Sequence, residues 1–354
     1  VKIEISAPGK LILFGEYAVL FGAPALVMAV NRRSRVVLSP SGGARWRYLA
    51  PGLASAPAEL EIDAAGGHRW YGDDDVVAEF GLVDRLLREL AAMELIDIKG
   101  ASAAEVVLDT TEFYTTRCGR RCKLGLGSSA ALTVATVAGL AAWSGTALGN
   151  PPDSVWLQAL VDVHRGIQGG KGSGVDVAAS AIGRVLNFRL AGDGSVSVAT
   201  PTTLPDGLIP VCIWTGKAAS TGDFLERLES RRRTRPREVE RALRRLCDVS
   251  ESGVVALSEG RAVRFLDSVG EFWEALDVLA EAIEMPILSN EHRRLRQLGD
   301  EIGVQYKPSG AGGGDFGIAL TDSKVAAEEI AGRAAAAGFE VVDLRIESEG
   351  VSES

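Results

Sequence analysis

Residues 123–131 read Lys-Leu-Gly-Leu-Gly-Ser-Ser-Ala-Ala and run directly into a stretch, 129–143, that is apolar on nearly every side. A stretch of that kind predicts a buried helix. A helix N-terminus presents unpaired N–H groups and the positive end of the helix dipole, which suits phosphate. Glycine lets the backbone approach a ligand closely. The string therefore predicts a phosphate-binding loop, in which Ser128 and Ser129 cap the helix or bind an ion.

Two better-known phosphate motifs do not explain this loop. A Walker A loop needs Gly-x4-Gly-Lys-Ser/Thr, and the chain contains no such string. Gly125, Gly127 and Ala130 match a dinucleotide fingerprint, but residues 115–122 are not the hydrophobic strand that must precede it. The plainer alternative is a serine-capped helix that follows a turn, and the residues alone leave it open.

Glycine and lysine gather at the same places. Segments 9–22, 125–127, 166–174 and 310–317 hold 3, 2, 5 and 5 of the 41 glycines, in about a tenth of the chain. Only eight of the 38 basic residues are lysine, and five of these eight lie in or near those segments or residues 215–221. They are Lys10, Lys123, Lys171, Lys217 and Lys307. Because lysine can sit as a point charge between phosphates, the pattern predicts an electropositive site for an anionic ligand.

Two carboxylates and a run of arginines are further candidates. Asp176 follows the third of these glycine segments, where it either caps a helix or positions the attacking oxygen in phosphoryl transfer. Glu16 lies in the first segment, and the same two alternatives stay open for its carboxylate. The arginine-rich residues 227–245 are interpreted as a solvated helix face, with a lid or substrate clamp as the alternative.

Composition excludes several classes of protein. A net charge of −9 argues against binding to nucleic acid or to an anionic membrane. The longest weakly polar stretch, 130–143, is too short to span a bilayer, and the first residues lack the pattern of a secretory signal. Four cysteines, with Cys118 and Cys122 four apart, and three histidines do not form a zinc pattern. We therefore expect a cytoplasmic protein with free thiols.

The periodicity predicts an α+β fold. Residues 201–210 contain several prolines, so we expect a domain boundary there that divides the chain into 1–200 and 201–354. The expected helices are 76–93, 129–143, 154–163, 175–181, 224–252, 254–282 and 323–337. The expected strands are 2–6, 11–14, 25–30, 35–38, 105–108, 186–189, 196–199, 211–214, 316–320 and 340–344, while 39–67 is expected to be loop and hairpin.

Three strings, taken together, resemble the GHMP kinase superfamily. Residues 7–19 (Ala-Pro-Gly-Lys-Leu-Ile-Leu-Phe-Gly-Glu-Tyr-Ala-Val) look like its first motif, 125–131 like its second and 309–315 (Ser-Gly-Ala-Gly-Gly-Gly-Asp) like its third. Within the superfamily, residues 123–131, 168–179 and 214–221 are most similar to the phosphomevalonate kinases. Tyr17 is also similar to that family, whereas mevalonate kinases usually have His at this position.

The resemblance implies a two-domain GHMP kinase fold. The N-terminal, ATP-binding domain would be like ribosomal protein S5 domain 2, and the C-terminal domain would be ferredoxin-like. Lys10 and Asp176 match the family's catalytic pair, and Mg²⁺ would lie near Ser129. ATP would lie over Lys123, Leu124, Gly125, Leu126, Gly127, Ser128, Ser129 and Ala130. The acceptor would contact Glu16, Tyr17, Ser173, Gly174, Lys217, Ser220, Thr221, Gly312 and Gly313.

One position departs from the family pattern. Mevalonate kinases carry a glutamate metal ligand upstream of the catalytic aspartate, whereas this chain reads Val-His-Arg-Gly at residues 163–166. The nearest carboxylate is Asp162. The departure puts metal coordination by this segment in question, and His164 or Arg165 would instead face phosphate.

The resemblance also implies a reaction, in which ATP phosphorylates 5-phosphomevalonate to 5-diphosphomevalonate on the mevalonate route to isoprenoids. Three alternatives stay open at this point. One is a mevalonate kinase or another small-molecule kinase of the superfamily, the second is a non-catalytic relative that binds a metabolite or a protein, and the third is a decarboxylase of the same fold. The expected partner is a phosphorylated small molecule, bound by a monomer or homodimer.

Overall fold

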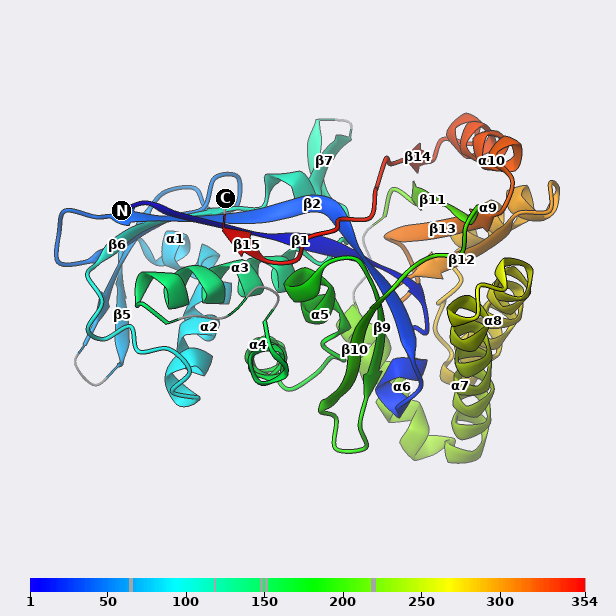
Figure 1. Cartoon of the computed structure of the whole chain (residues 1–354), viewed down its shortest axis with the longest axis horizontal. Coiled ribbons are helices and arrows are strands. Elements are labelled where there is room, and N and C mark those ends of the chain that lie inside the picture. Colours follow the sequence, from blue (N-terminus) through cyan, green and yellow to red (C-terminus); the bar gives the residue numbers. More distant parts are fainter. Residues whose placement is uncertain (64–65, 118, 147–148, 150–151, 218–220, 354) are drawn as a thin grey trace.

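The computed structural model describes residues 1–63, 66–117, 119–146, 149, 152–217 and 221–353. Its strands form a large sheet, a smaller four-stranded sheet at the other end of the molecule, and a short hairpin (Figure 1). Among the described residues, no helix combines the length and the apolar character that crossing a membrane requires.

The large sheet is built on two long neighbouring strands, β1 and β2. Its strands are β1 (Ile3–Phe14), β2 (Ala25–Pro40), β3 (Trp46–Leu49), β4 (Ala58–Ile62), β5 (His68–Tyr71), β6 (Ala104–Asp109), β9 (Val185–Leu190), β10 (Val196–Thr202) and β15 (Ser352–Glu353). They follow the order β10-β9-β2-β6-β3-β4-β5, and β1 pairs with β2 and β15. All neighbours are antiparallel except β3 and β6.

Strand β1 carries the start of the first glycine segment past the phosphate-binding loop. Its pairing with β2 shifts register between Pro8 and Gly9. A Cβ at Gly9 would lie 2.6 Å from the carbonyl oxygen of Leu126, so only glycine allows this approach. The irregularity and the glycine together bring β1 against the loop that precedes the next helix.

Helices cover one face of the large sheet (Figure 1). They are α1 (Asp74–Glu79), α2 (Gly81–Ala92), α3 (Ser128–Trp143), α4 (Ser154–Ile167) and α5 (Val175–Ile182), and short 3-10 turns occupy η1 (Ala18–Phe21) and η2 (Thr111–Phe113). Helix α3 contacts both β1 and β2 and is buried on nearly every side, as its sequence predicts.

The second half builds an antiparallel sheet in the order β12-β13-β11-β14. Its strands are β11 (Ile209–Trp214), β12 (Gln305–Ser309), β13 (Phe316–Thr321) and β14 (Glu340–Val341). Its helices are α6 (Thr221–Thr234), α7 (Pro236–Ser258), α8 (Ala262–Ile283), α9 (Asn290–Asp300) and α10 (Lys324–Ala336). Helices α8 and α9 contact β12, and α10 contacts β11 and β13.

A continuous apolar core joins the two halves. Phe14, at the end of β1, is fully buried with its ring centroid 4.5 Å from that of Phe272 and 5.4 Å from that of Phe265. Both partners belong to α8. Gly253 of α7 lies against the Phe14 ring with no room for a Cβ. The end of β1 is therefore held by the second half of the chain.

The last residues return to the large sheet, where Arg33 of β2 holds them. Strand β15 pairs with β1 at Ile5 and Ser6. The Arg33 guanidinium donates to the carbonyl oxygen of Gly350 at 2.6 Å and to Ser352 Oγ at 3.1 Å. It also donates to Ser6 Oγ at 2.9 Å. One side chain thus binds β1, β2 and the C-terminal segment together.

Most expected elements are confirmed, and several bounds are corrected. The helix expected over 76–93 breaks at Phe80 into α1 and α2. The helices expected over 224–252 and 254–282 are three, because Pro236 begins α7, which then continues to Ser258. Residues 39–67 contain β3 and β4, which pair antiparallel as the expected hairpin. The polar elements α9 and β12 were not expected. The boundary at residues 200–201 stays a prediction.

Replacing Arg33 with Ala should release the C-terminal segment. Because several charge-assisted hydrogen bonds are lost together, we expect the free energy of unfolding to fall by about 2–3 kcal/mol in urea denaturation. Arg35→Ala removes the same charge from the same strand, but its partner is the half-exposed Glu112. That control should lose less than about 1 kcal/mol. Equal losses in the two variants would contradict this account.

Candidate active site

The phosphate-binding loop ends in a glycine cap that leaves the first turn of α3 open. Gly127 is the N-cap, has φ 76°, and supplies no side-chain hydrogen bond. The serine-capped helix is therefore not what forms, because Ser128 is already the first helical residue. The first amides of α3 remain available for an anion, as the phosphate-loop interpretation requires.

An exposed hairpin precedes this loop. It consists of β7 (Tyr114–Arg117) and β8 (Arg120–Lys123), which are antiparallel to each other. A dinucleotide fingerprint requires a buried parallel strand here. The expectation that the Rossmann context is missing is confirmed.

Lys10 lies across the phosphate-binding loop. Its backbone N–H donates to the carbonyl oxygen of Leu126 at 2.9 Å. A Cβ at Gly127 would lie only 3.0 Å from Lys10 Cγ, so the lysine stem follows the glycine cap. The loop and strand β1 therefore fix the direction in which the ammonium group extends.

Asp176 comes from the start of α5 but does not cap it. The N-cap is Gly174, which has φ 80°, and Asp176 is the second helical residue. Its Oδ1 accepts the N–H of Val177 at 3.0 Å. The capping alternative is thus excluded, and the half-buried carboxylate lines a cavity.

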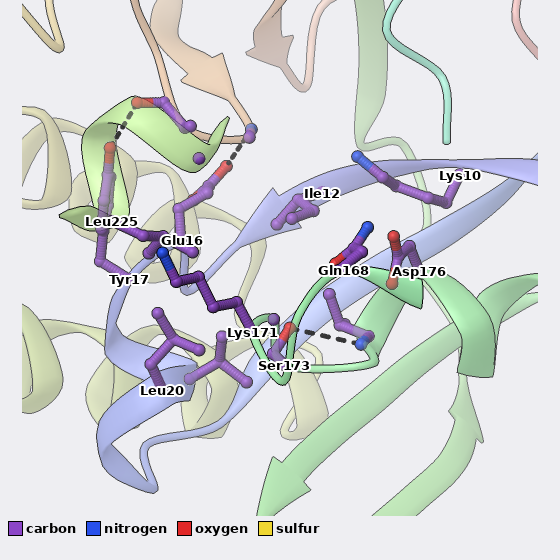
Figure 2. Close-up of a pocket in the computed structure, with 16 residues that line it drawn as sticks. Lys10, Ile12, Glu16, Tyr17, Leu20, Gln168, Lys171, Ser173, Asp176 and Leu225 are labelled. Carbon is purple, nitrogen blue, oxygen red and sulfur yellow. Dashed lines mark hydrogen bonds between the residues drawn. The ribbon is translucent and has the colours of Figure 1, made fainter. Parts of the chain in front are cut away.

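This acceptor cavity brings together several of the predicted residues (Figure 2). Its volume is about 380 Å³. In Figure 2, Lys10, Gln168 and Asp176 lie at one end, and Glu16, Tyr17, Leu20 and Leu225 lie at the other. The lining residues are Lys10, Ile12, Glu16, Tyr17, Val19, Leu20, Gln168, Lys171, Gly172, Ser173, Val175, Asp176, Gly222, Leu225, Gly310 and Ala311.

A buried ion pair lies at the end of the acceptor cavity that Glu16 lines. Lys307 Nζ of β12 donates to Glu16 Oε1, and the Lys307 side chain has no exposed surface. Burial raises the pKa of Glu16 and lowers that of Lys307, and the charge of each partner opposes the shift in the other. Because β1 leads into Glu16 and β12 carries Lys307, the pair links the two halves.

The third glycine loop, residues 310–315, is bonded from both halves. Gly310 N donates to Glu16 Oε1 at 3.3 Å, and the Tyr17 hydroxyl donates to the carbonyl oxygen of Ala311 at 2.5 Å (Figure 2). Gly313 N donates to the carbonyl oxygen of Ile287 at 2.8 Å. The loop is therefore held in place before any ligand arrives.

A second cavity, of about 190 Å³, borders the phosphate-binding loop. Lys123, Ser128 and Ser129 line it together with apolar residues of α2, among them Leu82 and Val83. A largely apolar pocket beside phosphate-binding amides suits the base of a nucleotide. Lys123, Ser128 and Ser129, three of the residues predicted to contact ATP, thus line one cavity.

The metal prediction finds little support from protein ligands. Ser129 Oγ lies 3.3 Å from Nε2 of the buried His164, in the segment where the resemblance to mevalonate kinases implied a glutamate. Mg²⁺ prefers oxygen ligands, and no group of three or more His, Cys, Asp or Glu side chains among the described residues is arranged to hold a metal. The described side chains do not form a Mg²⁺ cage. Arg165 does not face an open phosphate site either, because its guanidinium donates to the carbonyl oxygens of Gly172 and Ser173.

Some predicted acceptor contacts lie elsewhere. Lys217 pairs with Glu291 of α9 and does not line the acceptor cavity. Gly312 and Gly313 lie against Ile287 and Phe224, so their neighbours Gly310 and Ala311 line the cavity instead. Gly174 packs against Val161, while Ser173 lines the cavity. Ser220 lies outside the described residues, and Thr221 is the first residue of α6.

The lysine prediction is partly wrong. Lys10 and Lys171 share the acceptor cavity and Lys123 lines the second one, but Lys307 is neutralised in the buried pair with Glu16. One of the five lysines, Lys307, therefore joins the two halves of the chain and does not contribute to an electropositive site. Neither the alternation of β12 nor its composition distinguishes Lys307 from a solvent-facing lysine.

The arginine run has the properties of a solvated face. Arg232, Arg233 and Arg235 are exposed, and Arg227, Arg231 and Arg235 all pair with Glu284 at the end of α8. None of these side chains lines the acceptor cavity.

Sequence reasoning also missed Gln168, Leu225 and Ala311 as lining residues, because their types carry no chemical signal. Cys122, Cys212 and Cys247 are free thiols, and Cys118 lies outside the described residues.

Two family models match the chain, and each matched range contains residues that line the acceptor cavity. The GHMP kinases N terminal domain matches residues 120–184, which hold the phosphate-binding loop and Asp176. The GHMP kinases C terminal domain matches residues 254–340, which hold Lys307 and the third glycine loop. Both matches are to domains of GHMP kinases, one in each half of the chain.

Relatives that match most of the chain include phosphomevalonate kinases and mevalonate kinases. A phosphomevalonate kinase of Streptomyces sp. (strain CL190) is 29% identical over 347 residues, 90% of this chain and 89% of the relative. A mevalonate kinase of Thermococcus sibiricus is 26% identical over 99% of this chain and 98% of its own length. The structure of Streptococcus pneumoniae phosphomevalonate kinase in complex with phosphomevalonate and AMPPNP matches with a TM-score of 0.74 at 19% identity, covering 97% of this chain and 99% of that one. The two-domain GHMP kinase fold is confirmed.

Losing one partner of the buried ion pair and losing both should not have additive effects on stability. Glu16→Met or Lys307→Met leaves an unpaired buried charge, so each should lower the free energy of unfolding by about 3–5 kcal/mol. The double variant should lose at least about 2 kcal/mol less than the sum of the two single losses.

The exposed pair Arg45–Glu59, with N–O 3.1 Å, provides a matched cycle. Its coupling energy should stay below about 1 kcal/mol in the same denaturation assay. Additive losses for Glu16 and Lys307 would show that the pair does not join the halves.

Proposed function

We propose that this protein is a phosphomevalonate kinase, which transfers the terminal phosphoryl group of ATP to 5-phosphomevalonate. The observation that carries the proposal is the position of Lys10, whose stem crosses the glycine cap of the phosphate-binding loop and which lines the same cavity as Asp176. The loop receives the donor nucleotide and the cavity receives the acceptor. Lys10 therefore lies between two anionic groups.

The charge of the acceptor explains why lysine is the more important member of this pair. A phosphate monoester has its second pKa near 6, so the attacking oxygen is already mostly ionised at neutral pH. It needs little proton abstraction. The harder task is to hold two polyanions together, which suits Lys10, Lys171 and the amides at the start of α3. We infer that Asp176 orients Lys10 and the acceptor. Mg²⁺, which suits ATP phosphates, would arrive with the nucleotide.

Mevalonate kinase is the second candidate, favoured by the relative that covers 99% of this chain. Its acceptor is an alcohol, whose oxygen must lose a proton, so Asp176 would be a general base. ADP release should therefore be measured with mevalonate, phosphomevalonate and diphosphomevalonate in parallel, with CO2 detection for the last. Turnover of phosphomevalonate alone supports the proposal. Turnover of mevalonate alone contradicts it, CO2 release indicates a decarboxylase, and no turnover favours a non-catalytic binding protein.

The two catalytic candidates should differ in their effects on kcat. Lys10→Ala should lower kcat by about 10²–10³-fold, as does loss of one preorganised charge-stabilising group. Asp176→Asn should lower it by no more than about tenfold, because a general base that normally contributes about 10²–10⁴-fold is not needed. Lys2→Ala, which changes an exposed lysine paired with Glu4, is the control and should leave kcat unchanged. The reverse order of the first two effects would contradict the proposed role of Asp176.

A further inference from the structure

A buried histidine at the start of α9 contacts the third glycine loop. His292 is fully buried in the first turn of α9, which Ser289 caps. Its Nδ1 lies 2.8 Å from the hydroxyl oxygen of Tyr306 on β12. Its Nε2 lies 3.0 Å from the carbonyl oxygen of Gly314, within the loop. One ring thus bridges a strand of the small sheet and the loop that borders the acceptor cavity.

The chemistry of the partners fixes the direction of both hydrogen bonds. A carbonyl oxygen only accepts, so Nε2 carries the proton and donates to Gly314. In the neutral ring Nδ1 then accepts, and the Tyr306 hydroxyl donates to it. Burial lowers the pKa of His292 to about 4, so the ring is neutral near pH 7. Gly317 leaves the space that the Tyr306 hydroxyl occupies.

Gly314 belongs to the third glycine loop, whose first residues border the acceptor cavity and whose last residue borders the phosphate-binding loop. On one side, Gly310 and Ala311 line the acceptor cavity. On the other side, the Asp315 carboxylate packs against Gly125 of the phosphate-binding loop and leaves no room there for a Cβ. A shift of the Gly314 carbonyl would therefore move both ends.

The same turn of α9 holds the segment that binds Asp315. Glu291 pairs with Lys217, whose carbonyl oxygen accepts the Asp315 N–H at 2.7 Å. The Asp315 carbonyl oxygen accepts the N–H and the hydroxyl of Thr215, each at 2.9 Å. Asp315 has φ 54°, a backbone conformation that needs such support. Two consecutive residues of α9 thus hold consecutive residues of the loop, His292 directly and Glu291 through Lys217.

We propose that His292 is a positioning residue for phosphoryl transfer. By holding the Gly314 carbonyl, it keeps Gly310 and Ala311 at the acceptor cavity and Asp315 against the phosphate-binding loop. The kinetic part of this inference rests on the function proposed above. The geometric part does not, because it concerns the loop in the free protein.

Three variants separate positioning from simple packing. His292→Leu removes both hydrogen bonds, and His292→Gln keeps an amide donor for Gly314. Tyr306→Phe is the matched control, because it removes a buried hydrogen bond to the same ring but leaves the bond to Gly314. Each variant should be assayed below its own melting temperature for kcat and for the KM of ATP and phosphomevalonate. Amide hydrogen exchange of residues 310–316 should be followed in parallel.

We expect His292→Leu to lower kcat by about 10–100-fold, the loss that a small misplacement of a site produces. His292→Gln should recover most of that loss, and Tyr306→Phe should keep kcat close to the wild-type value. Exchange over 310–316 should quicken in His292→Leu only. Wild-type kinetics in folded His292→Leu, or an equal loss in Tyr306→Phe, would overturn the proposal.

The failure of the proposed function can be told apart from the failure of this inference. If the wild-type protein turns over none of the acceptors, exchange over 310–316 and affinity for AMPPNP decide the matter. Faster exchange and weaker AMPPNP binding in His292→Leu, but not in Tyr306→Phe, would still support positioning by His292. Unchanged exchange and affinity in His292→Leu would overturn it.

Discussion

Glu16 and Lys307 form an ion pair with almost no exposed surface, and the candidate site depends on where that pair lies. Two charges that have left water tolerate few arrangements, because each needs the other and its hydrogen bonds to offset desolvation. The end of β1 and the start of the third glycine loop must therefore meet at one place. The Phe14 ring, packed on α8, holds the same strand end by apolar contact.

The third glycine loop shows what this constraint does for the site. Glu16 and Tyr17 bind its first residues, Ile287 its middle, and His292 the carbonyl of Gly314. Its partners come from the segment that follows β1 and, in the other half, from the connection between α8 and α9 and from the first turn of α9. A loop bonded at so many points loses little entropy when a ligand binds. Preorganisation of this kind suits a reaction in which positioning and charge stabilisation matter most.

The phosphate-binding loop could be predicted from the sequence because its signal is local: glycines, small residues and an apolar helix follow one another. The placement of Lys10 and Asp176 in one cavity followed from the family resemblance, not from spacing. The roles of Lys307 and His292 could not be predicted, because a buried lysine and a buried histidine look like surface residues until their partners are known. Helix α9 and strand β12 were missed for the same reason, since β12 carries its charge inward and α9 buries only a narrow stripe.

The central claim is that the oxygen which attacks ATP belongs to a phosphate group held beside Lys10. Phosphorus NMR of the full chain with ATP, Mg²⁺ and 5-phosphomevalonate tests this most directly, because it reports which bond forms. The account predicts a new pair of mutually coupled phosphorus signals, distinct from those of ADP, as the phosphomonoester signal of the acceptor disappears. An unchanged phosphomonoester signal, together with the appearance of a new phosphomonoester when mevalonate replaces phosphomevalonate, would contradict it.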